Sequence, residues 1–352
     1  MAVDKLTPTD SRVTHHTVTL PSSRGSRVYH YLLANPPSSS NPPAGTILLV
    51  HGFPDLSFGW RYQIPFLLSL NLRVVVPDMI GYGRTSSPAS PAHYSYKSVC
   101  DDLAALVKLA VPDEPQILIG GHDWGGAVVW RMCLWYPSLI KAVFSVCTPY
   151  TPPSPQFVDK KTVVSAVLPN FGYQIQFEDP ALEEKVTSQG RAGIRKFLSC
   201  LYGARANGRP AMTGEKGIPL ELFEGEQIGK SPLLSDDELE FYVSEYERNG
   251  VHGPLNWYRT WEVNFDEERE LVEQGRLKIA QPALIVTASR DIALPPAMAA
   301  GMDKWCDKLT RRGVECSHWA IWEKPAEVNK WVGEFLGRVL KGDGEGKVKA
   351  SI

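Results

Sequence analysis

Apolar runs of strand length recur along the chain and alternate with stretches of helical pattern. The runs are TILLV (46–50), RVVVP (73–77), QILIG (116–120) and AVFSV (142–146). Nearly continuous apolar runs are typical of strands that are buried on both faces of a parallel sheet, and helices between them make a βαβ series. Two earlier β-rich segments, VTHHTVTL (13–20) and SRVYHYLLA (26–34), predict an antiparallel hairpin at the edge of the sheet.

The pattern changes after Thr148. The segment TPYTPPSPQ (148–156) is rich in proline, and the long stretch that follows is helical and aromatic without a clear buried strand. The α/β pattern returns with ALIVTASRD (283–291) and GVECSHWAI (313–321), and a helix is expected in EVNKWVGEFLGRVL (327–340). These changes predict an α/β core domain, residues 1–148 and 261–352, with a mostly parallel sheet flanked by helices. A helical lid is expected as an insertion at 149–260.

Composition and charge narrow the possible partners. Of the 352 residues, 43% are apolar and 22% are charged, which is typical of a globular protein. The net charge is −2, and without a basic stripe we expect neither nucleic acid nor an anionic membrane as a partner. The polar N-terminus and the short apolar runs predict no secretory signal and no membrane span. The last three residues, ASI, differ from the peroxisomal signal S-K-L, so a cytoplasmic location is expected.

The cysteines give no sign of a disulfide or zinc framework. They form no C-x-x-C pair and are scattered through apolar segments, as expected of reduced core thiols. The six positions are Cys100, Cys133, Cys147, Cys200, Cys306 and Cys316. Separately, neither a metal nor an organic cofactor is expected.

The segment QILIGGHDWGGAVVWRM (116–132) places a strand, a turn of small residues and a helix in immediate succession. Its turn GHDWG (121–125) is the G-x-S-x-G nucleophile elbow with Asp123 at the position of the serine. A carboxylate is already ionised at neutral pH and can attack a saturated carbon without a base, which suits epoxides and alkyl halides. Hydrolysis of the resulting ester does need a base and an oxyanion hole. The alternative is that Asp123 merely caps the following helix.

Asp291 and His318 complete the order nucleophile, acid, histidine that the elbow fold requires. Each follows a predicted strand, at the carboxyl edge of the sheet where α/β active sites form. His318 is the only one of the eight histidines placed late enough in the chain to serve as the base. The alternatives are a backbone-bonded loop histidine at 318 and a turn or capping residue at 291, with Asp303 or Glu323 supplying the carboxylate.

The oxyanion hole is expected from two backbone amides. The strand TILLV (46–50) leads into the segment LVHGFP (49–54), where this fold contributes one N–H of the oxyanion hole. The residue after the nucleophile contributes the other, so we predict the backbone amides of Phe53 and Trp124 as the donors. His51 is interpreted as a structural loop residue. Asp78, in PDMIGYGR (77–84), is interpreted as a structural hydrogen bonder rather than a second nucleophile.

With these residues in place, the sequence resembles the soluble epoxide hydrolases of the α/β-hydrolase superfamily, especially the single-domain enzymes of fungi and plants. The resemblance runs nearly from end to end. It rests on HGFPD, PDMIGYGRTSSP, GGHDWGGAVVW, NFGYQIQF, GPLNWYR, TASRD and SHWAIWEKPAEVN. It implies conversion of epoxides to vicinal diols through an ester on Asp123, which water activated by His318 then hydrolyses. The phosphatase-like domain of the mammalian enzymes is not expected here.

The resemblance also implies residues that bind the substrate. Tyr173 in NFGYQIQF and Tyr258 in NWYRT are the pair whose hydroxyls hold the epoxide oxygen; the alternative for each is a packing role. A phenol stays protonated at neutral pH and can donate as the alkoxide develops. The apolar pocket of the family maps onto four residues that could also be plain core: Phe53, Trp124, Leu294 and Trp319. The partners expected are a small lipophilic epoxide, of lipid or xenobiotic origin, and water, in a detoxifying role.

Two other functions remain open from the sequence alone. A haloalkane dehalogenase shares the elbow aspartate, but typically has Asn after His-Gly where this chain has Phe53, and lacks the NWYR motif. A non-catalytic ligand receptor is possible because the fold alone does not fix the function. The presence of Asp123, Asp291 and His318 together argues against a receptor.

Overall fold

One large sheet organises the first of two parts of the protein. The computed structural model describes residues 3–22, 24–37, 42–225 and 227–342. Within these residues an eight-stranded sheet has the order β1-β2-β4-β3-β5-β6-β9-β10. Its strands are β1 (Thr14–Leu20), β2 (Arg27–Ala34), β3 (Gly45–Val50), β4 (Leu72–Pro77), β5 (Ile117–His122), β6 (Ile140–Val146), β9 (Ile279–Ala288) and β10 (Cys306–Val314).

The pairing of the strands confirms the predicted fold class. The hairpin β1–β2 is antiparallel and joins β4 in the antiparallel sense, and every later pair from β4 to β10 is parallel. Strands β3, β5 and β6 are almost wholly buried, as their apolar runs predict. Because parallel strands end at one edge, the loops after β3, β5, β6 and β9 lie close together there.

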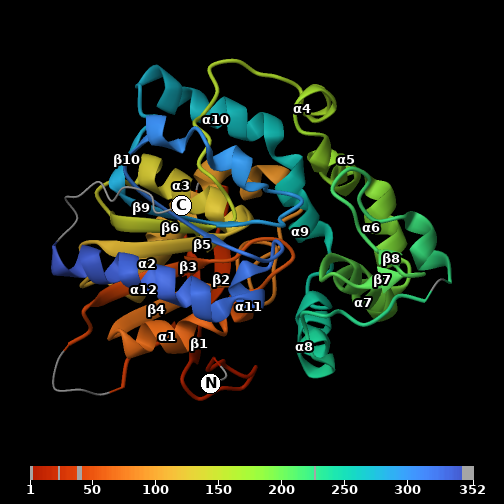
Figure 1. The fold of residues 1–352 in the computed structure, drawn as a ribbon, viewed down its shortest axis with the longest axis horizontal. Helices are drawn as coiled ribbons and strands as arrows, with labels where there is room; N and C mark the ends of the chain where they lie inside the picture. Colours follow the sequence, from red (N-terminus) through yellow and green to blue (C-terminus); the bar gives the residue numbers. More distant parts are fainter. Residues whose placement is uncertain (1–2, 23, 38–41, 226, 343–352) are drawn as a thin grey trace. The chain divides into compact units, whose positions relative to one another are not determined.

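Helices cover the faces of this sheet. They are α1 (Gln63–Ser69), α2 (Tyr96–Ala110), α3 (Trp124–Trp135), α11 (Ala320–Glu323) and α12 (Pro325–Lys341), with short 3-10 turns η1 (Ser57–Trp60), η6 (Pro296–Ala299) and η7 (Met302–Lys304). Helix α1 contacts α12, and α3 contacts α2; Figure 1 shows the strands between the α1–α12 pair and α3. The predicted helix at 327–340 is confirmed as most of α12.

The last predicted strand is misplaced. We expect it within GVECSHWAI (313–321), but β10 is Cys306–Val314, and residues 315–319 form a loop before α11. Strand β10 lies at one edge of the sheet and is mostly part-exposed, because its sequence CDKLTRRGV carries polar side chains. An edge strand with a solvated face lacks the continuous apolar run that marks the buried strands. His318 therefore follows β10 on a loop, four positions after Val314.

The chain divides into two compact units. The first unit is Met1–Met79, Tyr96–Pro155 and Glu267–Ile352, and the second is Ile80–Ser95 with Gln156–Asp266. Helix α10 (Trp261–Glu273) passes from the second unit to the first. No helix in the described ranges is both long and apolar enough to cross a membrane.

The second unit is built from short helices. They are α4 (Lys160–Ala166), α5 (Gly172–Glu178), α6 (Pro180–Thr187), α7 (Gly190–Leu201), α8 (Asp236–Tyr246), α9 (His252–Asn256), and the 3-10 turns η2 (Pro91–Tyr94), η3 (Pro169–Phe171), η4 (Leu220–Glu224) and η5 (Trp257–Arg259), with the small hairpin β7 (Arg205–Ala206) and β8 (Arg209–Pro210). The buried Trp257 explains why residues 80–95 belong here: its indole N–H donates to the carbonyl of Ile80 (3.1 Å) and its ring packs on Tyr82 and Tyr94.

Candidate active site

Asp123 stands on the turn between β5 and α3 in a sparsely populated backbone conformation, with φ 55° and ψ −126°. Glycines at two positions permit this turn, because a side chain at either would collide with the backbone. A Cβ on Gly121 would lie 2.3 Å from the carbonyl oxygen of Gly125, and a Cβ on Gly125 would lie 2.0 Å from the carbonyl oxygen of Val50. The Asp123 side chain makes no capping hydrogen bond to α3, so the capping alternative is wrong. Its Oδ1 instead accepts the backbone N–H of Phe53 (2.7 Å).

His318 lies between two carboxylates. Its Nδ1 is 2.8 Å from Asp291 Oδ2, and its Nε2 is 3.5 Å from Asp123 Oδ2. Asp291 is itself fixed, because its Oδ1 accepts the amide N–H groups of Ala293 and Leu294 (both 2.9 Å). The predicted triad members thus come together, and Asp291 is the carboxylate that contacts Nδ1 of His318.

The two alternative carboxylates are engaged elsewhere. Asp303 pairs with Arg311 (2.5 Å), and Glu323 accepts a hydrogen bond from the hydroxyl of Ser317. Neither makes the contact with His318 that Asp291 makes.

The charges around His318 set its protonation. Burial alone would lower the pKa of His318, but Asp291 and Asp123 outweigh burial and raise it from 6.5 to about 10. Burial would raise the pKa of Asp291, but the charge and hydrogen bond of His318 prevail and lower it to about 2. At neutral pH the site therefore holds an imidazolium between two carboxylates.

The loop after β3 brings Phe53 to the nucleophile and is itself held by buried polar residues. His51 accepts the N–H of Met79 at its Nε2 (2.8 Å), and burial lowers its pKa to about 4, so the ring is neutral. Asp78 accepts the N–H of Ser57 (3.0 Å) and pairs with His30 (2.7 Å). These contacts give His51 and Asp78 the structural roles expected of them.

Three of the predicted apolar pocket residues lie near triad residues in the sequence, and the fourth, Phe53, contacts Asp123 through its backbone amide. Phe53 and Trp319 are buried, whereas Trp124 and Leu294 are partly exposed. The ring of Trp319 packs edge-on against the ring of His318 (5.5 Å between centroids) and stacks on Trp322. The structure therefore places apolar surface next to the base.

Tyr173 and Tyr258 meet inside the second unit. Tyr173 lies on α5 and Tyr258 on η5, and their rings pack edge to face with centroids 5.9 Å apart. Phe177 packs against both rings (5.3 and 5.0 Å), and both tyrosines are buried. Two segments that are far apart in the sequence thus bring the two phenols together.

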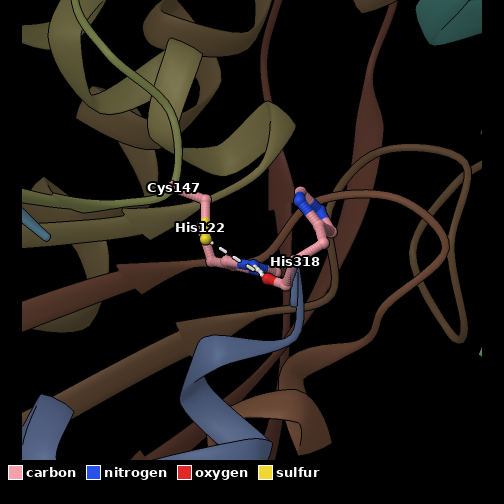
Figure 2. Close-up of side chains that lie close together, drawn as sticks. All are labelled: His122, Cys147 and His318. Carbon is pink, nitrogen blue, oxygen red and sulfur yellow. Dashed lines mark hydrogen bonds between the residues drawn. The ribbon is translucent and has the colours of Figure 1, made fainter. Parts of the chain in front are cut away.

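One cluster near the triad was missed by the sequence analysis. His122, Cys147 and His318 each offer one possible metal-ligating atom, all within 4.8 Å of one another. Figure 2 shows instead that His122 Nε2 (2.8 Å) and Cys147 Sγ (3.2 Å) both donate to the backbone carbonyl of His318. Burial and the charge of Asp291 raise the pKa of the Cys147 thiol well above its usual value, whereas a metal needs the thiolate. We interpret the cluster as hydrogen bonds that hold the loop of the base.

Comparison with known proteins gives a consistent result. Residues 45–209 match the family model of the alpha/beta hydrolase fold. The epoxide hydrolase srdG of Neurospora crassa is 45% identical over 347 residues, which cover 97% of this chain and all of that protein. The bifunctional epoxide hydrolase 2 of Mus musculus is 38% identical over 82% of this chain, which spans about half (51%) of the mouse protein's length.

Solved structures show the same fold. A laboratory-evolved variant of potato epoxide hydrolase has a TM-score of 0.75 at 23% identity, covering 93% of this chain and 99% of that one. An epoxide hydrolase from Vigna radiata has a TM-score of 0.76 at 24% identity, covering 93% of this chain and 98% of that one. At this identity the two structures support the fold alone.

Proposed function

The chain belongs to the epoxide hydrolases of the α/β-hydrolase fold, and from this membership we propose that it converts epoxides to vicinal diols through a covalent ester on Asp123. The observation that carries the mechanism is the placement of the Asp123 carboxylate, with one oxygen on the amide of Phe53 and the other 3.5 Å from His318. Membership in this family favours an epoxide over a haloalkane as the substrate.

In the first step, Asp123 attacks a ring carbon of the epoxide and the C–O bond of the ring breaks. The carboxylate is ionised at neutral pH and needs no base for this attack. The epoxide oxygen leaves as an alkoxide that must receive a proton. We assign that proton to the phenols of Tyr173 and Tyr258, and the 5.9 Å distance between their rings supports a shared task.

In the second step, His318 removes a proton from water, which attacks the carbonyl carbon of the ester. Alkylation of Asp123 removes the negative charge that helps to keep His318 protonated, so the pKa of His318 falls as the ester forms. The proton that the imidazolium then releases restores the phenol that gave its proton in the first step, so the ring of His318 becomes neutral and acts as the base. Asp291 orients the ring and stabilises the cation that returns.

The oxyanion hole belongs to the same step. When water adds to the ester, negative charge develops on its carbonyl oxygen, and backbone N–H groups stabilise that charge. The amide of Phe53 already donates to a carboxylate oxygen of Asp123. The amide of Trp124, which opens α3 directly after the nucleophile, is the second donor in our assignment.

The substrate and its setting are also proposals. Phe53, Trp124, Leu294 and Trp319 supply an apolar wall for a lipophilic epoxide, of lipid or xenobiotic origin. Residues 149–260, which contain most of the second unit, act as the lid domain. We also propose a detoxifying role in the cytoplasm.

Oxygen labelling tests the mechanism directly. In a single turnover of styrene oxide in heavy-oxygen water, the label should enter the Asp123 carboxylate, because the water adds to the carbonyl carbon of the ester. Peptide mass spectrometry locates the label, and Asp123→Ala serves as the inactive control. Label in the diol alone would mean that water attacks the epoxide directly, and the covalent mechanism would be wrong.

A further inference from the structure

The two residues that follow β6 form an unusual turn. The N–H of Thr148 bonds to the carbonyl of Val146 (2.9 Å) around Cys147, whose φ is 68°. A bond from residue i+2 to residue i with a positive φ at the centre defines the γ-turn that is rare and strained. Such strain persists only where the surrounding structure enforces it, and it is concentrated at functional sites.

Thr148 holds the backbone of the nucleophile. Its hydroxyl donates to the carbonyl of Asp123 (2.7 Å), directly at the strained elbow. The turn is rigidly anchored, because the Thr148 carbonyl accepts from the hydroxyl of Ser145 (2.7 Å) and the indole N–H of Trp130 (3.0 Å). Helix α3 packs closely against this turn because residue 126 is a glycine. A Cβ added to Gly126 would lie only 2.6 Å from the Cβ of Thr148.

Cys147 holds the backbone of the base. Its thiol donates to the carbonyl of His318 (3.2 Å), and the Nε2 of His122 donates to the same oxygen (2.8 Å), as Figure 2 shows. The backbone of Cys147 is tied to β9, since its N–H bonds to the carbonyl of Val286 (2.8 Å). Both His122 and Cys147 are fully enclosed, so neither bond competes with bulk water.

We propose that the turn at Cys147 and Thr148 is a positioning device that fixes the nucleophile and the base relative to each other. One residue holds the carbonyl of Asp123, and its neighbour holds the carbonyl of His318. A strained turn does this better than a relaxed one, because it directs two successive side chains to two different loops. The inference rests on the proposed function, in which Asp123 and His318 act in successive steps.

The two halves of the turn should affect the two steps differently. Loss of the Thr148 hydroxyl loosens Asp123, which attacks the epoxide and then carries the ester, so alkylation slows and hydrolysis slows with it. Loss of the Cys147 thiol loosens the base, which the first step does not use, so hydrolysis of the ester slows. We expect each effect to be about 3- to 10-fold, the range that one neutral hydrogen bond gives. The conservative changes Thr148→Ser and Cys147→Ser keep a donor and should restore most of each rate.

Single-turnover stopped-flow kinetics with styrene oxide separate the two rate constants through tryptophan fluorescence. The variants are Thr148→Val and Cys147→Ala, each beside its serine counterpart. Cys133→Ala, which deletes another buried thiol of the first unit from α3, controls for a general loss of packing. Melting temperatures are recorded for all variants so that the rates refer to folded protein.

The expected result is a split: Thr148→Val slow in alkylation and in hydrolysis, Cys147→Ala slow in hydrolysis alone with accumulating ester, and Cys133→Ala slow in neither. Slowed alkylation in Cys147→Ala, unchanged rates in either variant, or no rescue by serine would each overturn the positioning role. The proposed function is tested separately by the unmodified protein in the same experiment. If it forms no ester at all, the covalent mechanism fails, whereas normal ester formation with unaffected variants removes only the role of the turn.

Discussion

Asp123 combines a strained backbone with a charge that changes during the reaction. A residue held in such a conformation costs about 1–3 kcal/mol, and aspartate tolerates positive φ better than most side chains. The strain lets the carboxylate reach the amide of Phe53 and approach His318 instead of capping α3. In the proposed mechanism, esterification neutralises one of the two carboxylates beside His318. The Asp123 carboxylate would thus stabilise the resting cation of His318 and, once alkylated, allow His318 to act as the base.

Removing the base should trap the ester. His318→Gln leaves Asp123 free to attack the epoxide but leaves no group to activate water, so hydrolysis should fall by about 10³-fold, within the usual range for a general base. Intact-protein mass spectrometry of the variant mixed with styrene oxide should show a stable adduct at Asp123. The double variant with Asp123→Ala must show none. An unmodified His318→Gln protein that still binds substrate would assign the base elsewhere.

The resting ion pairs should also make stability depend on pH. The pKa of His318 rises from 6.5 to about 10 on folding, so its stabilising contribution is complete below pH 6.5 and is lost as the pH rises toward 10. The melting temperature of the unmodified protein should therefore exceed that of His318→Gln most at low pH. This difference should shrink steadily across the window. A difference that is constant with pH would mean that His318 is neutral in the folded protein.

At the scale of elements, the sequence predicts what has a local signature. Strands β3, β4, β5 and β6 coincide with the apolar runs because burial on both faces leaves a continuous mark. Strand β10 escapes because its polar edge sequence leaves no such mark. The elbow was predictable from its glycines, and the pairing of Asp291 with His318 from their order in the chain. The turn at Cys147 was not, since no residue type announces a γ-turn; only its place directly after AVFSV, at the carboxyl edge, hinted at a role.

Helix α3 is joined to α10 by a buried ion pair that can be tested. Arg131 Nε lies 2.5 Å from Glu268 Oε1, and Arg131 Nη1 donates to the carbonyl of Thr151 (2.7 Å). Glu268→Gln leaves the guanidinium buried without its counter-charge, which should lower the free energy of unfolding by about 3 kcal/mol. Urea denaturation measures the change. The double variant Arg131→Met with Glu268→Leu should recover much of the lost stability. If the double variant is less stable than Glu268→Gln, the unpaired charge of Arg131 is not the cause of the loss.

For the whole molecule, the proposed reaction draws on both units. Asp123, Asp291 and His318 belong to the first unit, whereas Tyr173 and Tyr258 belong to the second. Apart from residues 80–95, the chain enters the second unit after Asp123 and returns to the first before Asp291 and His318. Sequence order alone could not show that residues 173 and 258 pack together, because 84 positions of loops and short helices separate them; the motifs did so only through resemblance.

In the proposed mechanism, the tyrosine pair decides which leaving group the enzyme can serve. An epoxide oxygen departs as an alkoxide and needs a proton, while a halide departs without one. Tyr173→Phe and Tyr258→Phe keep the packing against Phe177 and remove only the hydroxyl, so each should slow alkylation by styrene oxide about 10²-fold, and the double variant should lose nearly all of it. Any weak alkylation of Asp123 by a bromoalkane, followed in parallel by mass spectrometry, should hardly change in the same variants, which controls for damage to the nucleophile. Equal losses of alkylation rate with the epoxide and the bromoalkane would mean that the tyrosines shape the site without donating a proton. A double variant that opens epoxides at an undiminished rate would mean that Tyr173 and Tyr258 have no part in the mechanism.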